Sequence, residues 1–573
     1  MKNLVLPISD MTRLFLFFYL LVIIFIGCNN IYLEIDLFQI NILITFLSFL
    51  FLCITFVFKK ERPSLNYGLG SLSITLMLFL FYSATSFYNS SNADVSYFPA
   101  IKILSALFLA LALLDFIKNI DVIKKLLLLI FIFAGIHASI GILQQFIPSL
   151  LHQPDKFSSA STSLFHNPNF YSGYLVIHIP IGFYFMTQAR NNYLKALFTA
   201  IWLTIWVALG FSTSPGGQLV AGIQMFALIV YFLKNKESSN LKFLGWSLVF
   251  SLGVYVGLVN ILDYINQTSS ETVASTLVRR PLVWGHIENR LMYWSGAWSI
   301  FKDNWILGSG LWTFYELYPQ TGFKYTPPHA HSMYVQTAAE TGLIGFGLLM
   351  VCLATLYSNI VRIFKKASAQ VVDITFYVGL SISGFLIHNL IEYNWLVSSY
   401  IYLFILLVII IEVLSREIKE AKTLRFFPEA KGIYSKSVIL LMVLGMVTVI
   451  QFYHYNRLVS PRNLFGSTYE DMTLKTNQAS KLCGRCGDSR FLMGVANWDI
   501  FNQSQEKFFL DQAEREFMTA LEKSPNNLKS LMFLGDIKSL QGDLVSARKY
   551  YERAMVDSRY KENASLKLKA IEK

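Results

Sequence analysis

Residues 122–147 read VIKKLLLLIFIFAGIHASIGILQQFI, an apolar run longer than the roughly 20 residues that a helix needs to cross a membrane. Runs of this kind recur through most of the 573-residue chain, of which 54% is hydrophobic and only 15% is charged. A water-facing globular surface of this size requires more charge. The sequence therefore predicts an all-α fold, a polytopic membrane bundle of about thirteen transmembrane helices. We expect the spans at roughly 13–33, 37–58, 65–87, 97–117, 122–147, 168–188, 195–213, 216–233, 241–262, 332–360, 370–391, 395–414 and 437–455.

The short loops predict the orientation, because Lys and Arg gather in the loops on the cytoplasmic side. Every second loop is basic, whereas loops such as 88–96 carry neither Lys nor Arg. The first apolar run lacks a signal-peptide cleavage site, so we expect it to be retained with a cytoplasmic N-terminus. We therefore expect a multi-pass membrane protein whose long loop and tail lie outside the cytoplasm, which for the inner membrane of a Gram-negative bacterium is the periplasm. Its expected parts are N-terminal transmembrane helices at 1–262, a periplasmic loop domain at 263–331, C-terminal transmembrane helices at 332–455 and a periplasmic helical tail at 456–573.

The formal net charge of +12 does not indicate a nucleic-acid partner. The cations form short stripes at the expected cytoplasmic ends of helices, where anionic lipid headgroups are their natural partners. Cys483 and Cys486 form a Cys-Gly-Arg-Cys pair in the tail. In an oxidising compartment we favour a disulfide over a metal site, because no second pair completes four ligands. A thioredoxin-like redox role is a weaker alternative, because no βαβ pattern surrounds the pair.

The tail contains two segments that align at a spacing of 34 residues. Ala513, Phe517 and Ala520 in the first segment correspond to Ala547, Tyr551 and Ala554 in the second. This period, with Leu534, Gly535 and Gly542, resembles the tetratricopeptide (TPR) repeat. Stacked helix pairs of this kind offer a concave surface, so the resemblance implies a protein partner. A helical hairpin that only caps the membrane domain is the alternative.

The loop at 263–331 is the longest hydrophilic break in the expected bundle, and long loops on a rigid scaffold commonly carry binding and catalytic groups. His331 and Ser332 end this loop, and Gly342-Leu-Ile-Gly345 follows nine residues after the Ser. This arrangement resembles the superfamily of O-antigen ligases, O-antigen polymerases and bacterial protein O-oligosaccharyltransferases. Arg290 before a Gly308-Ser-Gly310 turn and the Asn-Pro-Asn element that ends at Asn169 fit the same family.

The resemblance implies a metal-independent glycosyltransferase without a cofactor, which moves a glycan from undecaprenyl diphosphate to an acceptor. If the acceptor is lipid A-core, the enzyme is an O-antigen ligase of lipopolysaccharide biosynthesis. A second lipid-linked unit makes a polymerase, and a protein makes an oligosaccharyltransferase. One departure is that relatives carry an Arg where this chain reads Ser212-Thr-Ser-Pro-Gly-Gly-Gln218, so another cation is expected to replace it.

Arg and His suit this reaction. Arg is permanently charged and matches phosphate oxygens, whereas His near neutral pH accepts a proton or donates a hydrogen bond to the diphosphate. We predict catalytic roles for His331 and Arg290. The predicted donor-diphosphate ligands are Arg279, Arg280, Arg290 and His329, and the predicted acceptor or sugar ligands are Asn167, Asn169, Gln336, His388 and Glu392.

Each of these residues also has a structural alternative. His331 could cap a helix, the arginines could contact lipid headgroups, and Asn167 with Asn169 could form an ordinary helix-entry turn. We expect His388 and Glu392, four residues apart, to share one helix face, where they could line the acceptor site or bond each other and Asn394. Gln336 and Glu340 have the same two alternatives: they could line the acceptor site, or they could bond each other.

Two further alternatives concern the whole loop and the whole chain. Aromatic side chains between 284 and 318 could stack on sugars, but we favour an amphipathic helix at the headgroup level. A transporter of lipid-linked sugars would place charges or broken helices near mid-membrane in paired halves, whereas the polar groups here gather at the outer ends of spans. A non-catalytic scaffold would leave the His331 motif without a purpose.

Overall fold

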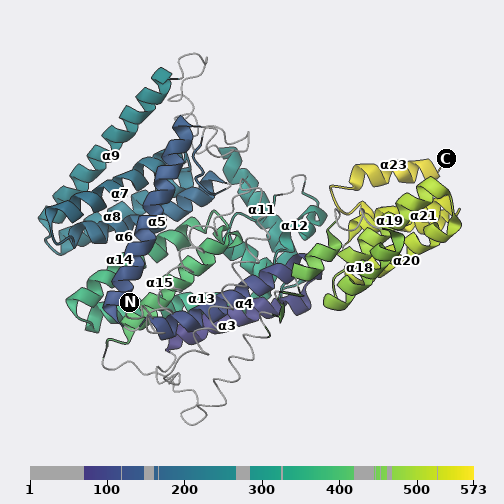
Figure 1. Ribbon diagram of the computed structural model, residues 1–573, viewed down its shortest axis with the longest axis horizontal. Helices are drawn as coiled ribbons and strands as arrows, with labels where there is room; N and C mark the ends of the chain where they lie inside the picture. The colour runs from purple at the N-terminus through teal and green to yellow at the C-terminus, as the bar shows by residue number, and fades with distance from the viewer. Residues whose placement is uncertain are drawn as a thin grey trace, which may run out of the picture.

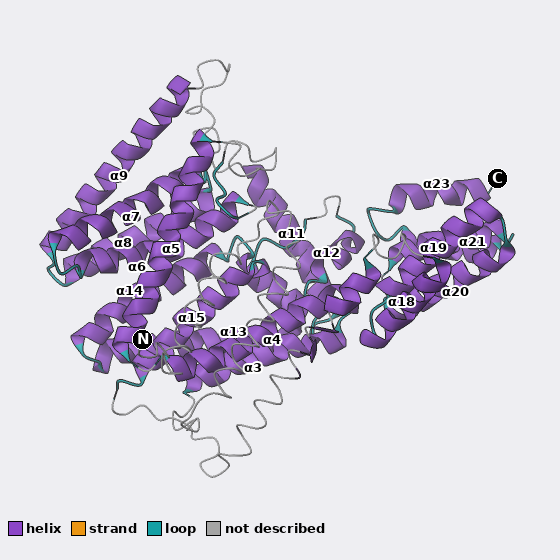
Figure 2. Ribbon diagram, viewed as in Figure 1, coloured by secondary structure: helices purple, strands orange, loops and turns teal. Residues whose placement is uncertain are grey.

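The computed structural model describes residues 70–117, 119–147, 160–165, 167–265, 284–323, 327–418, 453–460, 468–525 and 527–572, with five further residues between 444 and 451. Every regular element in these residues is a helix (Figure 2). Nine of the described helices are long and apolar enough to cross a membrane. The predicted all-α polytopic membrane fold is therefore confirmed. The expected spans at 13–33 and 37–58 lie outside the described residues, and the span at 437–455 lies largely outside them.

The bundle helices follow the predicted spans closely (Figure 1). Most of their ends coincide with Asn, Ser or Gly caps or with a proline at the first turn, as expected for helices that must satisfy their terminal N–H groups. The described bundle helices are α3 Ser71–Thr85, α4 Ala93–Phe116, α5 Ile120–Phe146, α6 Pro168–Thr187, α7 Asn192–Phe211, α8 Pro215–Lys234, α9 Ser238–Ile265, α13 Met333–Lys366, α14 Ala369–His388 and α15 Ser398–Ser415.

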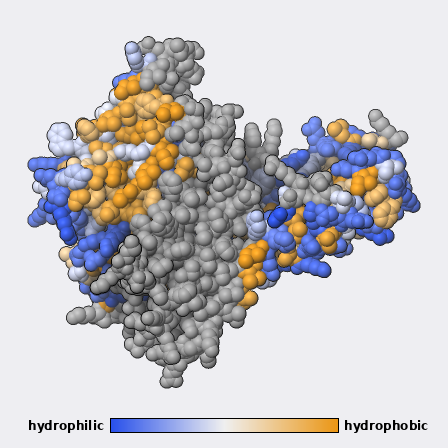
Figure 3. All heavy atoms as spheres, viewed as in Figure 1, coloured by the Kyte–Doolittle hydropathy of each residue, from blue (hydrophilic) through white to orange (hydrophobic). Residues whose placement is uncertain are grey.

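The centre of the bundle is formed by α6 and α15, which are buried along nearly their whole length. Helix α6 packs against α5, α7, α8 and α14, and α15 packs against α4, α13 and α14. The outer helices instead expose apolar side chains, and Figure 3 shows such atoms over the region of α7, α8 and α9. An exposed apolar face of this extent on a bundle of spanning length is lipid-facing.

The loop between the two groups of spans contains α11 Trp284–Asp303, the short helix α12 Phe314–Leu317 and the 3-10 turn η5 Tyr318–Thr321. Its turn at Gly308 lies against a kink of α13 at Gly342, where φ is +66°. A Cβ atom on Gly342 would lie 2.4 Å from the carbonyl oxygen of Ile306. The glycines of the two motifs therefore allow two backbones to touch, and Ser309 and Gly310 donate hydrogen bonds from their N–H groups to α13 carbonyls.

The tail consists of six described helices: α18 Tyr469–Leu482, α19 Asp488–Ser504, α20 Lys507–Lys523, α21 Leu528–Leu540, α22 Leu544–Ala554 and α23 Lys561–Ile571. The aligned residues of both predicted repeats are buried at helix contacts, and Gly535 lies against the ring of Tyr551. Gly542, with φ of +80°, forms the turn between α21 and α22. Cys483 and Cys486 form a disulfide, as predicted.

Among the described residues, the tail contacts the membrane domain near the start of α4 and at α12. At the start of α4, the Asp94 carboxylate accepts hydrogen bonds from the N–H group of Gly487 (2.7 Å), the hydroxyl of Tyr455 (2.8 Å) and the hydroxyl of Ser524 (3.2 Å). At α12, Arg559 forms an ion pair with Glu316 at 3.3 Å. These contacts hold the tail beside the loop that contains α11 and α12 (Figure 1).

Candidate functional site

A tight turn at the entry of α13 carries the two predicted loop histidines. The turn follows Pro327 and Pro328, and His331 adopts a left-handed backbone with φ of +49°, which is uncommon for a residue with a side chain. The side-chain oxygen of Gln336 accepts a hydrogen bond from the N–H group of Ala330 at 2.8 Å. The N–H group of Met333 donates to the carbonyls of Asn389 and Glu392. These bonds hold the turn against the segment after α14.

Glu392 is the acceptor at the centre of the site. Its side chain is buried, with 1% of the residue exposed. One carboxylate oxygen lies 3.0 Å from Nδ1 of His331, and the other accepts a hydrogen bond from Nδ2 of Asn169 at 3.0 Å. Burial acts to raise the pKa of Glu392, but the nearby imidazoles, His331 first, outweigh it and hold this pKa well below its usual range. The carboxylate is therefore ionised and can only accept hydrogen bonds.

His329 lies beside His331, with the two ring centroids 4.2 Å apart. Nδ1 of His329 lies 3.7 Å from Glu392 and accepts a hydrogen bond from the N–H group of His331 at 3.3 Å. Burial first, and then the electrostatic influence of the neighbouring His331 imidazole, lower the pKa of His329 to about 3. His329 is therefore neutral at ordinary pH. Since its Nδ1 accepts, its Nε2 carries the proton and is a hydrogen-bond donor.

The predicted Asn-Pro-Asn element joins the site through Asn169. Asn167 caps α6, and its side-chain oxygen accepts the N–H group of Asn169 at 2.8 Å, so Asn167 has the structural role of a helix-entry turn. Asn169 donates to Glu392 and accepts from the hydroxyl of Ser214 at 2.9 Å. Ser214 lies in the segment that lacks the Arg of the family. That segment is therefore linked to the Glu392 carboxylate by two hydrogen bonds through uncharged side chains, from Ser214 to Asn169 and from Asn169 to Glu392.

The expectation that His388 and Glu392 share a helix face is wrong. Helix α14 ends at His388, and Glu392 lies in the turn that follows, because the side chain of Asn389 binds the N–H group of Asn394 and closes that turn. His388 instead pairs with Nδ2 of Asn394 at 3.0 Å. A Cβ atom on Gly216 would lie 3.8 Å from Nε2 of His388. His388 is thus close to the segment where the family carries its Arg.

Arg290 lies on α11, half-buried, three residues before Tyr293. Its positive charge contributes to lowering the pKa of His329, which places the guanidinium within electrostatic reach of the turn. One turn along α11, the ring of Tyr293 stacks on His331 with centroids 5.7 Å apart. Arg279 and Arg280 lie outside the described residues.

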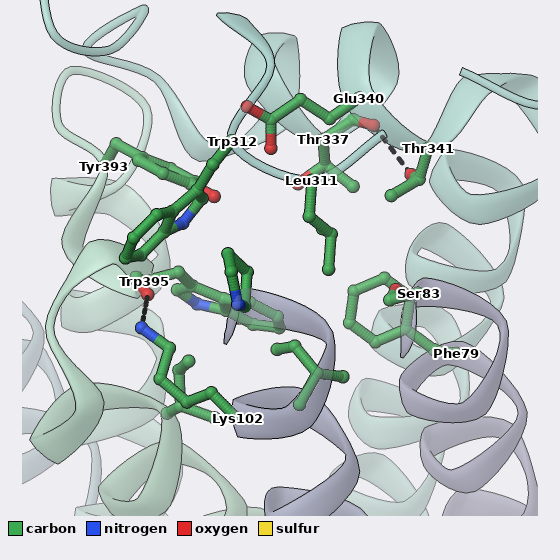
Figure 4. A pocket seen from close by; sticks show the side chains of 13 residues that line it. Phe79, Ser83, Lys102, Leu311, Trp312, Thr337, Glu340, Thr341, Tyr393 and Trp395 are labelled. Carbon is green, nitrogen blue, oxygen red and sulfur yellow. Dashed lines mark hydrogen bonds between the residues drawn. The ribbon is translucent and has the colours of Figure 1, made fainter. Parts of the chain in front are cut away.

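Gln336 and Glu340 lie behind the histidine turn and bond each other at 2.9 Å. Glu340 also lines a small cavity together with Lys102, Trp312 and Trp395 (Figure 4). Lys102 is 2% exposed, donates a hydrogen bond to the carbonyl of Trp395 at 3.4 Å, and lies 5.0 Å from the centre of the Trp312 ring. Lys102 is not among the predicted site residues, although a lysine inside an apolar run of spanning length is itself a signal.

The nitrogen and oxygen atoms of His329, His331 and Glu392 lie within 4.8 Å of one another, so these three residues could also hold a metal ion. The same atoms of His331 and Glu392 are already at hydrogen-bond distance. The arrangement therefore also fits an imidazole oriented by a carboxylate.

Residues 198–350 match the O-antigen ligase family. The matched segment includes Ser214, Arg290, His329 and His331, but it excludes Asn169, His388, Glu392 and the tail. A 75-residue stretch of the chain is 36% identical to the human protein named protein O-mannosyl-transferase TMTC1 and covers 13% of this chain and 8% of that relative. The match to the family supports a membrane ligase of the glycosyltransferase class.

Proposed function

We propose that this protein is an O-antigen ligase-type glycosyltransferase that moves a glycan from undecaprenyl diphosphate to an acceptor, lipid A-core, at the periplasmic face of the inner membrane. The observation that carries the proposal is the contact of His331, in the segment similar to O-antigen ligases, with Glu392 of the turn after α14. Because the ionised carboxylate can only accept, Nδ1 of His331 carries the proton of that bond. Its Nε2 is then the free basic nitrogen.

In the proposed reaction, the acceptor hydroxyl attacks the anomeric carbon of the lipid-linked glycan. A new bond forms from the hydroxyl oxygen to this carbon, and the bond from the carbon to the diphosphate oxygen breaks with its electron pair. Nε2 of His331 takes the hydroxyl proton, and the ionised Glu392 stabilises the resulting imidazolium. Arg290 pairs with the diphosphate, and the Nε2–H group of His329 donates a neutral hydrogen bond to it. Asn169 and His388 remain proposed ligands of the sugar or acceptor.

The topology is part of this proposal. The N-terminus is cytoplasmic, and the histidine turn and the tail are periplasmic, because the basic loops alternate along the chain. The tail docked beside the loop supports a role in receiving the acceptor or a protein partner. A protein acceptor is the second candidate, supported by this tail and by the name of the human relative. A second lipid-linked glycan as acceptor, and a transporter of lipid-linked sugars, rank below it.

The test uses purified full-length protein in nanodiscs, a synthetic polyprenyl-diphosphate glycan and each of three acceptors: lipid A-core, a Ser/Thr-containing protein and a second lipid-linked glycan. We expect transfer to lipid A-core, and loss of about 10²–10⁴ in rate for His331→Ala. Arg290→Lys should recover only part of the activity lost in Arg290→Ala, since Lys lacks the bidentate fork. The exposed His454→Ala is the matched control.

Two results would contradict the proposal. Undiminished transfer by His331→Ala would remove this histidine from the chemistry. Transfer that stops with a chelator and returns with an added divalent metal would show that the three close ligands hold an ion instead. Exclusive transfer to the protein acceptor would select the second candidate.

A further inference from the structure

Helix α11 has two faces of different character. The face turned into the protein carries Tyr293, which contacts His331 and Tyr318, and the fully buried Ala297 and Ile300. Gly296 lies on the same side, where a Cβ atom would be 2.3 Å from the Tyr318 ring. This face belongs to the site already described and fixes how α11 is rotated about its axis.

The opposite face of α11 is apolar and uncovered. Leu291 is 53% exposed and Trp298 is 57% exposed, and Ile287 is also exposed. Their separations of four and seven residues place all three on one side of a helix with 3.6 residues per turn. Glu288 and Lys302, also exposed, lie to one side of this row. A row of exposed aromatic and branched apolar side chains indicates a surface that contacts lipid or another protein.

The apolar row continues onto the lipid-facing surface of the bundle. Beyond α11, the turn residues Trp305 and Ile306 are exposed, and their carbonyls accept hydrogen bonds from the N–H groups of Leu343 (2.8 Å) and Ile344 (3.3 Å). Leu343 and Ile344 are themselves exposed at the tail-side end of the spanning helix α13. The row is therefore continuous with a surface that faces acyl chains.

We propose that α11 and the turn at 304–307 lie in the membrane interface on the tail side of the bundle, with the row of Ile287, Leu291 and Trp298 inserted into the boundary between headgroups and acyl chains. The occupant of this face is the lipid surface. Its continuity with α13 argues for lipid, and the flanking Glu288 and Lys302 lie where headgroups and water are available. The assignment rests on the membrane fold and holds independently of the proposed reaction.

A consequence concerns the depth of the site. The lipid row and the Tyr293 contact lie on opposite sides of one helix, so insertion of the row fixes the height of His331 relative to the headgroups. Arg290, between these two faces, is then held near the level at which lipid phosphates lie. A donor with a membrane-embedded tail and a diphosphate head would meet the guanidinium without leaving the bilayer.

The test places one nitroxide spin label at a time in full-length protein reconstituted in phosphatidylethanolamine and phosphatidylglycerol vesicles, after replacing Cys28, Cys53 and Cys352 by Ala. Leu291→Cys and Trp298→Cys report on the row, and Glu288→Cys is the matched control on the same helix. Collision rates with oxygen, which concentrates in lipid, are compared with those of a water-soluble nickel chelate.

We expect the ratio of oxygen to nickel collision rates to be several-fold higher at 291 and 298 than at 288. Equal nickel access at all three sites would show a water-exposed helix and overturn the proposal. Low access to both reagents at 291 and 298 would show that protein covers the row, which also overturns it. Quenching of tryptophan fluorescence by brominated lipids, compared between wild type and Trp298→Phe, keeps the test decisive should a label disturb the fold.

Discussion

Replacing Glu392 with Gln removes the charge at the centre of the site while keeping the shape of the side chain. In the wild-type protein one carboxylate oxygen binds His331 and the N–H group of Tyr393, and the other accepts from Asn169. A glutamine keeps one of these oxygens as an acceptor and turns the other into an NH₂ donor. If its oxygen stays with His331, its NH₂ group faces the amide of Asn169.

The size of the effect follows from these bonds. Asn169 can rotate its amide so that its oxygen faces the glutamine and its NH₂ group faces Ser214, which keeps a hydrogen bond at each contact, with the Ser214 hydroxyl then accepting instead of donating. The remaining loss is then the difference between a charged and a neutral hydrogen bond to His331, roughly 1–1.5 kcal/mol or about tenfold in rate. If the rotation is blocked, a further bond is lost and the decrease approaches about 100-fold.

The assay is steady-state transfer by purified protein, with kcat and KM determined separately for Glu392→Gln, His331→Ala and the double variant. Because Glu392 acts through His331, we expect Glu392→Gln to lower kcat more than it changes KM. We expect the double variant to have the same kcat as His331→Ala alone. Glu288→Gln, which replaces an exposed carboxylate on α11, is the control. Multiplicative losses in the double variant would refute the view that the two side chains act as a unit.

Three more outcomes follow from the structure. Gly342→Ala should lower the thermal unfolding midpoint and activity, since its backbone strain costs about 1–3 kcal/mol and its Cβ would meet a carbonyl, whereas Gly347→Ala, with open space around it, should do neither. Burial, and then the charge of Asp94, raise the pKa of Asp488 to about 7, so its share of docking stability is complete below about pH 4 and is lost as the pH rises through 7. The hydrogen-exchange protection factors of residues 485–491, which are corrected for the intrinsic pH dependence of amide exchange, should be lower at pH 8 than at pH 6, and Asp488→Asn should remove this difference. A phosphatase fused after Lys573 should be active, and an inactive one would overturn the proposed orientation.

The sequence predicted the helices well because each span is a long apolar run, and a helix is the structure that satisfies every backbone group inside lipid. Helix α5 begins at Ile120 and ends at Phe146, close to the expected 122–147. The disulfide of Cys483 and Cys486 followed equally from local spacing. In each case the deciding interaction lies within a few residues of sequence.

The site was predicted only in part, because its geometry depends on contacts between distant segments. The motif identified His331, but nothing near it in sequence shows that Glu392 faces it, 61 residues away. The helix-face argument for His388 and Glu392 failed because the end of α14 is set by Asn389 binding Asn394, a turn that apolar periodicity does not reveal. Lys102 escaped notice for a related reason, since a single cation hardly alters the hydropathy of its span.

The two halves of the site come from different parts of the chain, and only one of them lies in the segment that matches the family. The histidine turn and Arg290 lie inside the segment that matches the O-antigen ligase family, whereas the carboxylate and Asn169 lie outside it. The N–H group of Met333, at the start of α13, donates to carbonyls of the turn that holds Glu392, so the backbone of one half is bonded to that of the other. An imidazole needs a fixed partner at Nδ1 to present a basic Nε2. The chemistry proposed for the loop therefore depends on the packing of α6 and α14 as much as on the loop motif itself.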